Sequence, residues 1–138
     1  MKTRLSGIAV VLLASGAAHA QKAPADFCTG GEIAVLRLST LAQGGSRAGF
    51  DRAVSDQLAW YRTHDFKQNH ILTAPVIVQD ESSKQWSVSE TEIFSLHINP
   101  PPIDAVKADD GYRAFVAEFR TNSAVASERT ICLRDPVK

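Results

Sequence analysis

The sequence predicts an α+β fold in which four strands and two helices follow the order strand, helix, strand, strand, helix, strand. Two stretches space their apolar residues three and four positions apart, as one face of a helix does. Four other stretches carry apolar residues continuously or at alternate positions, which is typical of strands. Glycine, proline and charged residues separate these stretches and predict the turns between them.

Residues 1–20 precede this pattern and have the order of a secretory signal peptide. Lys2 and Arg4 give a basic start, Leu5 to Ala18 are uncharged, and Ala18-His19-Ala20 form a small-x-small cleavage site. The apolar stretch is shorter than the ~20 residues that span a bilayer. We therefore expect an exported protein, periplasmic or extracellular, with no membrane anchor and with residues 21–138 as one α+β domain.

The charge of the chain excludes some partners. The chain has 15 basic and 15 acidic residues, so loss of Lys2 and Arg4 leaves a net charge of −2. Nucleic-acid binders need a basic surface, and so do proteins that bind anionic membranes. We expect neither partner.

Cys28 and Cys132 lie near the two ends of the mature chain. In an oxidising compartment two cysteines most simply form one disulfide. A reactive thiol or a metal ligand is the alternative, but neither residue has a CxxC partner or a nearby histidine. The sequence therefore predicts a structural disulfide between the first and last elements.

The elements can be assigned in order. Residues 32–38 are almost continuously apolar, which predicts a strand buried on both faces. Phe50, Ala53, Val54, Leu58 and Tyr61 define a helical face. Residues 70–79 predict a strand, and because Pro75 cannot donate to a ladder, this strand is an edge or carries a bulge. Residues 80–84 form a turn and residues 86–98 the second strand of a hairpin.

The last third of the chain begins with residues 99–102, an Asn-Pro-Pro-Pro run that ends the strand. A second helix starts near Asp109 or Asp110, with an apolar face of Tyr112, Phe115, Val116 and Phe119. Residues 121–127 are predicted to be a loop and residues 128–133 a short final strand.

This order matches two split βαβ units, the ferredoxin-like sandwich, in which two helices cover one face of a four-stranded antiparallel sheet. The second strand is an edge in that topology, which suits Pro75. The first and last strands are antiparallel neighbours, which brings Cys28 close to Cys132. A first strand that is apolar on both faces implies that the face without helices is also covered.

The element order, the Trp60, Tyr61 and His64 cluster that ends the first helix, and Tyr112, Phe115 and Phe119 in the second helix are similar to the dimeric α/β-barrel superfamily. That resemblance implies that two open sheet faces pair into a barrel, which makes a homodimer the expected assembly. It also implies an activity like that of the cofactor-free monooxygenases or isomerases.

The first candidate site is the polar stripe on the third strand, formed by Ser89, Thr91, Ser95 and His97. If this face lines a dimer cavity, Arg37 also lines it, provided that Arg37 lies on the same face of the sheet as the stripe. Together these residues suit a small anionic or carbonyl-bearing ligand. The alternative is a solvent-exposed face, and Glu90 and Glu92 indicate a bulge that would change the parity.

The second candidate site lies at the end of the first helix and consists of Trp60, Tyr61, His64 and Asp65, of which Trp60 and His64 are one helical turn apart. His64 could form an acid–base pair with Asp65 or Glu92. The alternative is a packed aromatic residue beside a solvated histidine at a helix C-terminus. The spacing of His64, His70 and His97 does not require a metal site, and no catalytic or cofactor motif is present, so we expect neither a metal nor a cofactor.

Three functions follow from these observations. The first is an exported domain that binds a small, partly apolar ligand in a dimer cavity. The second is a periplasmic or cell-surface module that binds another protein. The third is an enzyme of the cofactor-free monooxygenase or isomerase kind, which needs a histidine or acid in a pocket rather than His64 and His97 both on the outer surface.

Overall fold

The computed structural model describes residues 22–101 and 108–134. The predicted signal peptide, residue 21 and Pro102 lie outside the described residues. The described residues form seven elements: η1 (Pro24–Phe27), β1 (Glu32–Leu41), α1 (Arg47–Thr63), β2 (His70–Gln79), β3 (Trp86–Ile98), α2 (Asp110–Asn122) and β4 (Ser123–Leu133).

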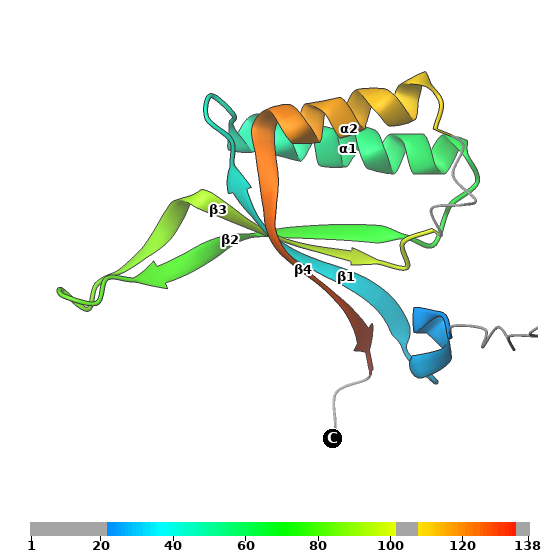
Figure 1. Ribbon diagram of the computed structural model, residues 1–138, viewed down its shortest axis with the longest axis horizontal. Helices are drawn as coiled ribbons and strands as arrows, with labels where there is room; N and C mark the ends of the chain where they lie inside the picture. The colour runs from blue at the N-terminus through cyan, green and yellow to red at the C-terminus, as the bar shows by residue number, and fades with distance from the viewer. Residues whose placement is uncertain (1–21, 102–107, 135–138) are drawn as a thin grey trace, which may run out of the picture.

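The four strands form one antiparallel sheet in the order β2-β3-β1-β4. Helices α1 and α2 lie side by side on one face of that sheet (Figure 1). This is the ferredoxin-like α+β sandwich, so the predicted fold class is confirmed.

The core lies between the helices and the sheet in two adjoining clusters. Phe50 and Val54 of α1 pack on Ile93 of β3, and Trp60 and Tyr61 pack on Phe115 of α2. Phe119 contacts both clusters, and its ring lies 5.4 Å from that of Phe50. Large apolar side chains at helical spacing therefore fix both helices on the sheet, as the sequence predicted.

Polar side chains begin both helices. The Ser46 hydroxyl accepts a hydrogen bond from the Gly49 amide at 3.0 Å, and the Asp109 carboxylate accepts one from the Tyr112 amide at 2.8 Å. The second contact confirms that α2 starts at this point. A Cβ on Gly49 would overlap the side chain of Asn122, so glycine is what allows the start of α1 to approach the end of α2.

Pro75 lies in an edge strand, as predicted, because β2 pairs only with β3. The ladder also shifts register between Pro75 and Ile77, and the extra residues lie on β3. There the Glu92 amide donates to the Ser89 hydroxyl at 3.1 Å. Beyond this bulge the β2–β3 hairpin continues past the helices as a projecting arm (Figure 1).

The predicted loop at residues 121–127 is wrong in its larger part. Helix α2 extends to Asn122, and β4 begins at the next residue, Ser123, and pairs with β1 from Leu41 onward. Residues 123–127 are serine, alanine and one valine, a composition with little intrinsic strand preference. Pairing with β1, rather than local propensity, makes this segment a strand.

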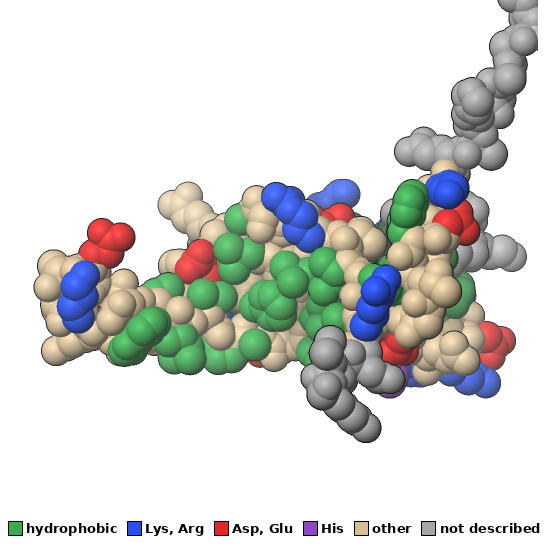
Figure 2. Space-filling view, turned by 90° about the horizontal axis from the view of Figure 1, so that it is seen from below, with side chains coloured by type: hydrophobic (Ala, Val, Ile, Leu, Met, Phe, Trp, Pro, Cys, Tyr) green, Lys and Arg blue, Asp and Glu red, His purple; other side chains and the backbone are tan. Residues whose placement is uncertain are grey.

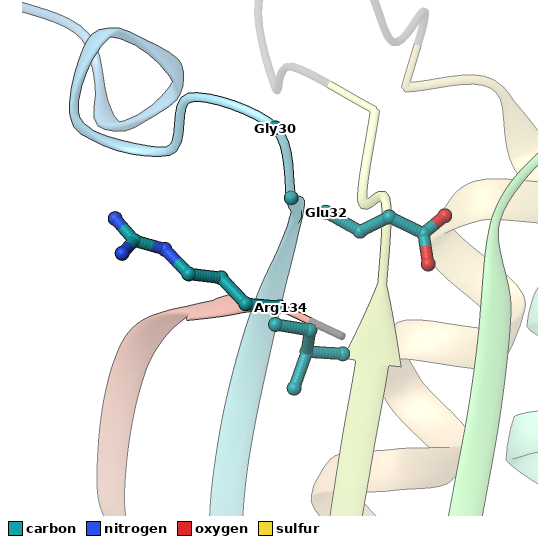
Figure 3. Close-up of a pocket in the computed structure, with 5 residues that line it drawn as sticks. Gly30, Glu32 and Arg134 are labelled. Carbon is teal, nitrogen blue, oxygen red and sulfur yellow. The ribbon is translucent and has the colours of Figure 1, made fainter. Parts of the chain in front are cut away.

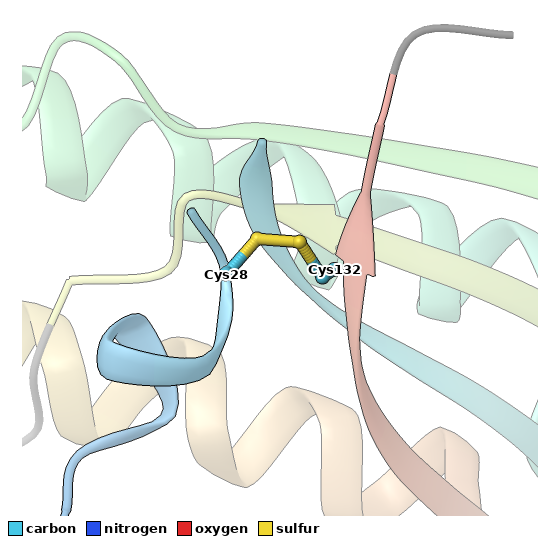
Figure 4. Close-up of a disulfide and its surroundings, with 2 residues drawn as sticks. All are labelled: Cys28 and Cys132. Atoms are coloured by element: carbon cyan, nitrogen blue, oxygen red, sulfur yellow. A yellow bond between two sulfur atoms is a disulfide. The ribbon is translucent and has the colours of Figure 1, made fainter. Parts of the chain in front are cut away.

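The disulfide is confirmed. Cys28 and Cys132 are joined at 2.00 Å, and their Cα atoms lie 5.3 Å apart (Figure 4). The bridge joins the segment before β1 to the end of β4, and β1 and β4 are neighbours in the sheet. Gly31 passes so close that an added Cβ would lie 2.9 Å from the Cys132 sulfur.

Candidate functional site

The polar stripe of β3 faces the helices rather than an open cavity, which corrects the first candidate site. Ser95 and His97 are buried, and they alternate with Phe94 and Leu96 on the other face. Ile93 has the same parity as Ser95 and His97 and is fully buried against α1. Ser89 and Thr91 come before or within the bulge, so they do not continue the stripe.

Arg37 joins this same side of the sheet. It pairs with Ser95 across β1 and β3, and directly paired residues share a face. Its guanidinium lies 2.6 Å from the Glu128 carboxylate of β4, at the border of the helix-covered region. The predicted association of Arg37 with Ser95 and His97 is therefore present, but on the helix side.

A buried polar network surrounds His97. The Asn69 amide nitrogen lies 3.2 Å from His97 Nε2, and Asn69 is only 2 % exposed. Arg62 of α1 donates to both the side-chain and the main-chain oxygen of Asn69. Because the Asn69 oxygen accepts from Arg62, its amide nitrogen donates to His97, whose Nε2 is then the unprotonated ring nitrogen.

The charge states in this network follow from burial. Burial, with the positive charge of Arg37 as a second cause, lowers the pKa of His97 to about 4. Burial also raises the pKa of Tyr61, whose ring lies 5.5 Å from that of His97 and whose hydroxyl accepts from Gln57. At neutral pH the cluster therefore holds a neutral imidazole and a neutral phenol beside the guanidinium groups of Arg37 and Arg62.

Trp60 and His64 form a separate cluster at the end of α1. Their rings stack with centroids 4.0 Å apart, as their spacing predicted. The acidic partner of His64 is Asp109, at 3.2 Å, and not Asp65 or Glu92. Asp65 points elsewhere and lies 3.6 Å from Lys67, because the chain turns sharply after α1 and Asp65 adopts a positive φ of 62°.

Asp109 connects the two helices through this cluster. Its carboxylate accepts from the Trp60 indole at 2.7 Å and from the Tyr112 amide, and these bonds lower the pKa of Asp109. The other ring nitrogen of His64 lies 2.9 Å from the Trp60 carbonyl oxygen. Both ring nitrogens of His64 therefore lie within hydrogen-bond distance of an oxygen atom.

Two shallow grooves flank the disulfide. One, of about 450 Å³, is lined by Gly30, Gly31, Glu32, Leu133 and Arg134. The side chains of Glu32 and Arg134 extend away from each other there (Figure 3). The second, of about 350 Å³, lies between the η1 turn and the end of β4. Charged groups therefore do not converge in the first groove.

The described residues contain no group of three histidine, cysteine, aspartate or glutamate side chains placed to hold a metal ion. Within 22–101 and 108–134 no helix has both the length and the apolar character needed to cross a membrane. The disulfide is of the kind found in exported proteins.

Among the described residues, no helix covers the face of the sheet opposite α1 and α2, and that face is apolar. We call it the open face, and it carries Leu36, Leu38, Leu72, Phe94, Leu96 and Ile98. Figure 2 views the molecule from this side and shows hydrophobic side chains gathered over its centre and continuing along the arm. Leu72 is 56 % exposed. Single exposed apolar residues are ordinary, but a contiguous patch marks an interaction surface.

Four residues of these clusters were not predicted from the sequence: Tyr61 as a neighbour of His97, and Arg62, Asn69 and Asp109 as hydrogen-bond or ion-pair partners. Ile93 has the same parity as Ser95 and His97, and a large apolar residue among polar ones belongs to the buried side. Ile93 could therefore have predicted that the polar stripe faces the helices. The contact of Asp109 with His64 had no local signal, since the two residues belong to different elements.

No family model and no curated protein sequence matches this chain. Among solved structures, the chain is similar to SnoaB, a cofactor-independent oxygenase from Streptomyces nogalater. The identity is 12 %, the TM-score is 0.47, and the match covers 78 % of this chain and 97 % of that one. The fold assignment rests on the strand order and pairing described above.

Proposed function

We propose that this chain is an exported domain that dimerises through its open face and binds a small, largely apolar molecule between the two sheets. The uncovered apolar face is the observation that carries the proposal. The signal-peptide pattern of residues 1–20 and the disulfide support export.

A second copy suits the open face because the face carries both signs of charge at different positions. Glu92 pairs with Thr40 near one end, and Arg129 pairs with Leu36 at the β4 edge. In a two-fold dimer the same surface meets itself, so a face with separated opposite charges can bring them together reciprocally. Leu36, Phe94 and Leu96 would line the space between the sheets, which favours an apolar ligand.

The test is the mass of the purified, oxidised, exported protein by light scattering coupled to size exclusion. We expect a dimer, and Leu72→Glu should weaken it about 100-fold or more because it buries a charge without a partner. Val125→Glu is the matched control, since Val125 is 55 % exposed but pairs with Ser39 on the helix side. A wild-type monomer would contradict the proposal and leave the open face to another protein.

The helix-side cluster supports a second candidate, a ligand site or a cofactor-free enzyme in which Arg37, Ser95 and His97 contact the substrate and Trp60 and His64 lie nearby. The supporting observation is the burial of His97 beside Arg37 and Tyr61. His97 is a weak candidate for a general base because its Nε2 already accepts a hydrogen bond from the Asn69 amide. Loss of ligand binding in Arg37→Gln and His97→Gln, with dimerisation intact, would favour this site over the open face.

A further inference from the structure

Glu92 and Arg129 carry opposite charges on the open face and do not meet within one protomer. Glu92 of β3 pairs with Thr40, and Arg129 of β4 pairs with Leu36, so both have the parity of the open face. The Arg129 guanidinium donates to the Glu128 main-chain carbonyl at 2.7 Å. Within the described part of the chain neither Glu92 nor Arg129 belongs to an ion pair. Each charge can therefore bind a group outside its own protomer.

Glu92 is the better placed of two acidic residues whose strand pairing puts them on the open face. The other is Glu32, which pairs with Leu133 at the far end of β1. The Glu32 carboxylate also accepts a hydrogen bond from the Asn99 side chain at 2.7 Å. Glu92 is therefore the acidic partner that the open face offers to Arg129.

The register gives the separation of the two charges. Thr40 and Leu36 are four residues apart on β1, and β3 and β4 flank β1 on its two sides. With about 4.8 Å between strands and about 3.4 Å per residue, Glu92 and Arg129 lie about 10 Å apart across the strands and about 14 Å along them. That is too far for an ion pair on one surface. The point midway between the two residues is Leu38 of β1.

A two-fold axis over this midpoint exchanges the two charged positions. Resting on the open-face dimer proposed above, we infer that Glu92 of each protomer forms an ion pair with Arg129 of the partner subunit, with the axis over Leu38. Every contact in such a dimer occurs twice, so both ion pairs form together. Facing sheets lie about 10 Å apart, a gap that a glutamate and an arginine side chain span together.

The apolar residues of the open face support this position of the axis. The axis runs perpendicular to the line from Glu92 to Arg129. That direction leads from Leu38 to Leu72, which lies two strands across and two residues along, in the row of Leu36. The strands of the two sheets then cross at roughly 70°, close to the orthogonal class of sheet packing. Leucines therefore meet at the middle of the interface and the ion pairs lie at its rim, as is usual for protein interfaces.

The test is charge reversal, measured by the dimer dissociation constant of the purified, oxidised, exported protein. Arg129→Glu and Glu92→Arg each place like charges at both contacts, and we expect each to raise the dissociation constant about 10-fold or more. The double variant exchanges the two charges and should bring the constant back to within about threefold of the wild-type value. Arg52→Glu is the control, because Arg52 pairs with Glu118 between the helices, and it should leave the constant unchanged.

A zero-length crosslink gives an independent readout. In Arg129→Lys, a carbodiimide should join the introduced amine to the Glu92 carboxylate of the other protomer as an amide, which peptide mass spectrometry of the covalent dimer locates. Adding Glu92→Gln should abolish it. A dimer that Leu72→Glu dissociates, but that shows neither charge-reversal rescue nor this crosslink, would overturn the ion pair while the open-face dimer stands. A wild-type protein that is monomeric at every concentration would overturn both.

Discussion

Asn69 donates a hydrogen bond of 3.2 Å to Nε2 of His97, joining the residue just before β2 to β3 beneath helix α1. Arg62, near the end of α1, donates in turn to the Asn69 oxygen atoms. The Arg62 guanidinium therefore fixes the position of the Asn69 amide that bonds to the His97 imidazole. Because Nε2 accepts this bond, the His97 ring is neutral in the folded protein. The stability of the fold should therefore depend on pH.

His97 should make the protein less stable as the pH falls from about 6.5 to 4. The pKa of His97 is about 4 in the folded state against 6.5 when unfolded, so in this interval only the unfolded chain binds the proton. The full effect is ~3 kcal/mol in the free energy of unfolding. Urea unfolding at pH 7, 5.5 and 4.5 measures it, and His97→Gln should remove it. An equal pH dependence in that variant would contradict the assignment.

Arg37→Gln should raise the pKa of His97, because it removes a positive charge that opposes protonation. Titration of the imidazole by NMR measures the shift. Arg52→Gln is the control, since Arg52 forms a comparable ion pair with Glu118 between the helices, away from His97. Loss of the Arg37–Glu128 pair itself should cost only about 0.2–1 kcal/mol, as is usual for exposed pairs. No movement of the His97 titration would mean that the two side chains are not neighbours in solution.

Asn69→Leu should lower the free energy of unfolding by about 2–4 kcal/mol. The substitution removes the side-chain oxygen that accepts from Arg62 and leaves the buried His97 ring without its donor. Gln79→Leu is the control, because it removes a side-chain amide hydrogen bond, to the Lys84 carbonyl, at an exposed position, and it should cost less than about 1 kcal/mol. Equal costs for the two variants in chemical denaturation would show that the buried network adds nothing.

Removal of the disulfide should be among the most destabilising single changes. Cys28 and Cys132 are 104 residues apart, and a bridge that closes a loop of that length contributes ~4–5 kcal/mol in the chain-entropy model. Cys132→Ser, and reduction of the wild type, should lower the unfolding free energy by about that amount. A reduced protein of unchanged stability would show that β1–β4 pairing alone holds these ends together.

Local pattern was sufficient for most of the fold. The spacing of Phe50, Ala53, Val54 and Tyr61 defined α1, the capping carboxylate of Asp109 marked the start of α2, and Pro75 identified the edge strand. Each of these signals lies within a few residues of the element that it specifies. The pairing of Cys28 with Cys132 followed from composition and from the adjacency of the first and last strands.

The sequence by itself determined the order of elements, the helix-covered sheet and the disulfide, because periodicity, capping and turn residues act locally. Only the tertiary structure decided which face the stripe of Ser95 and His97 presents, since the bulge between Ser89 and Glu92 changes the parity along β3. Only it decided that residues 123–127 are strand, and that His64 meets Asp109. Those outcomes depend on contacts between segments that are far apart in the chain. The energies of such contacts cannot be predicted from the residues of either segment alone.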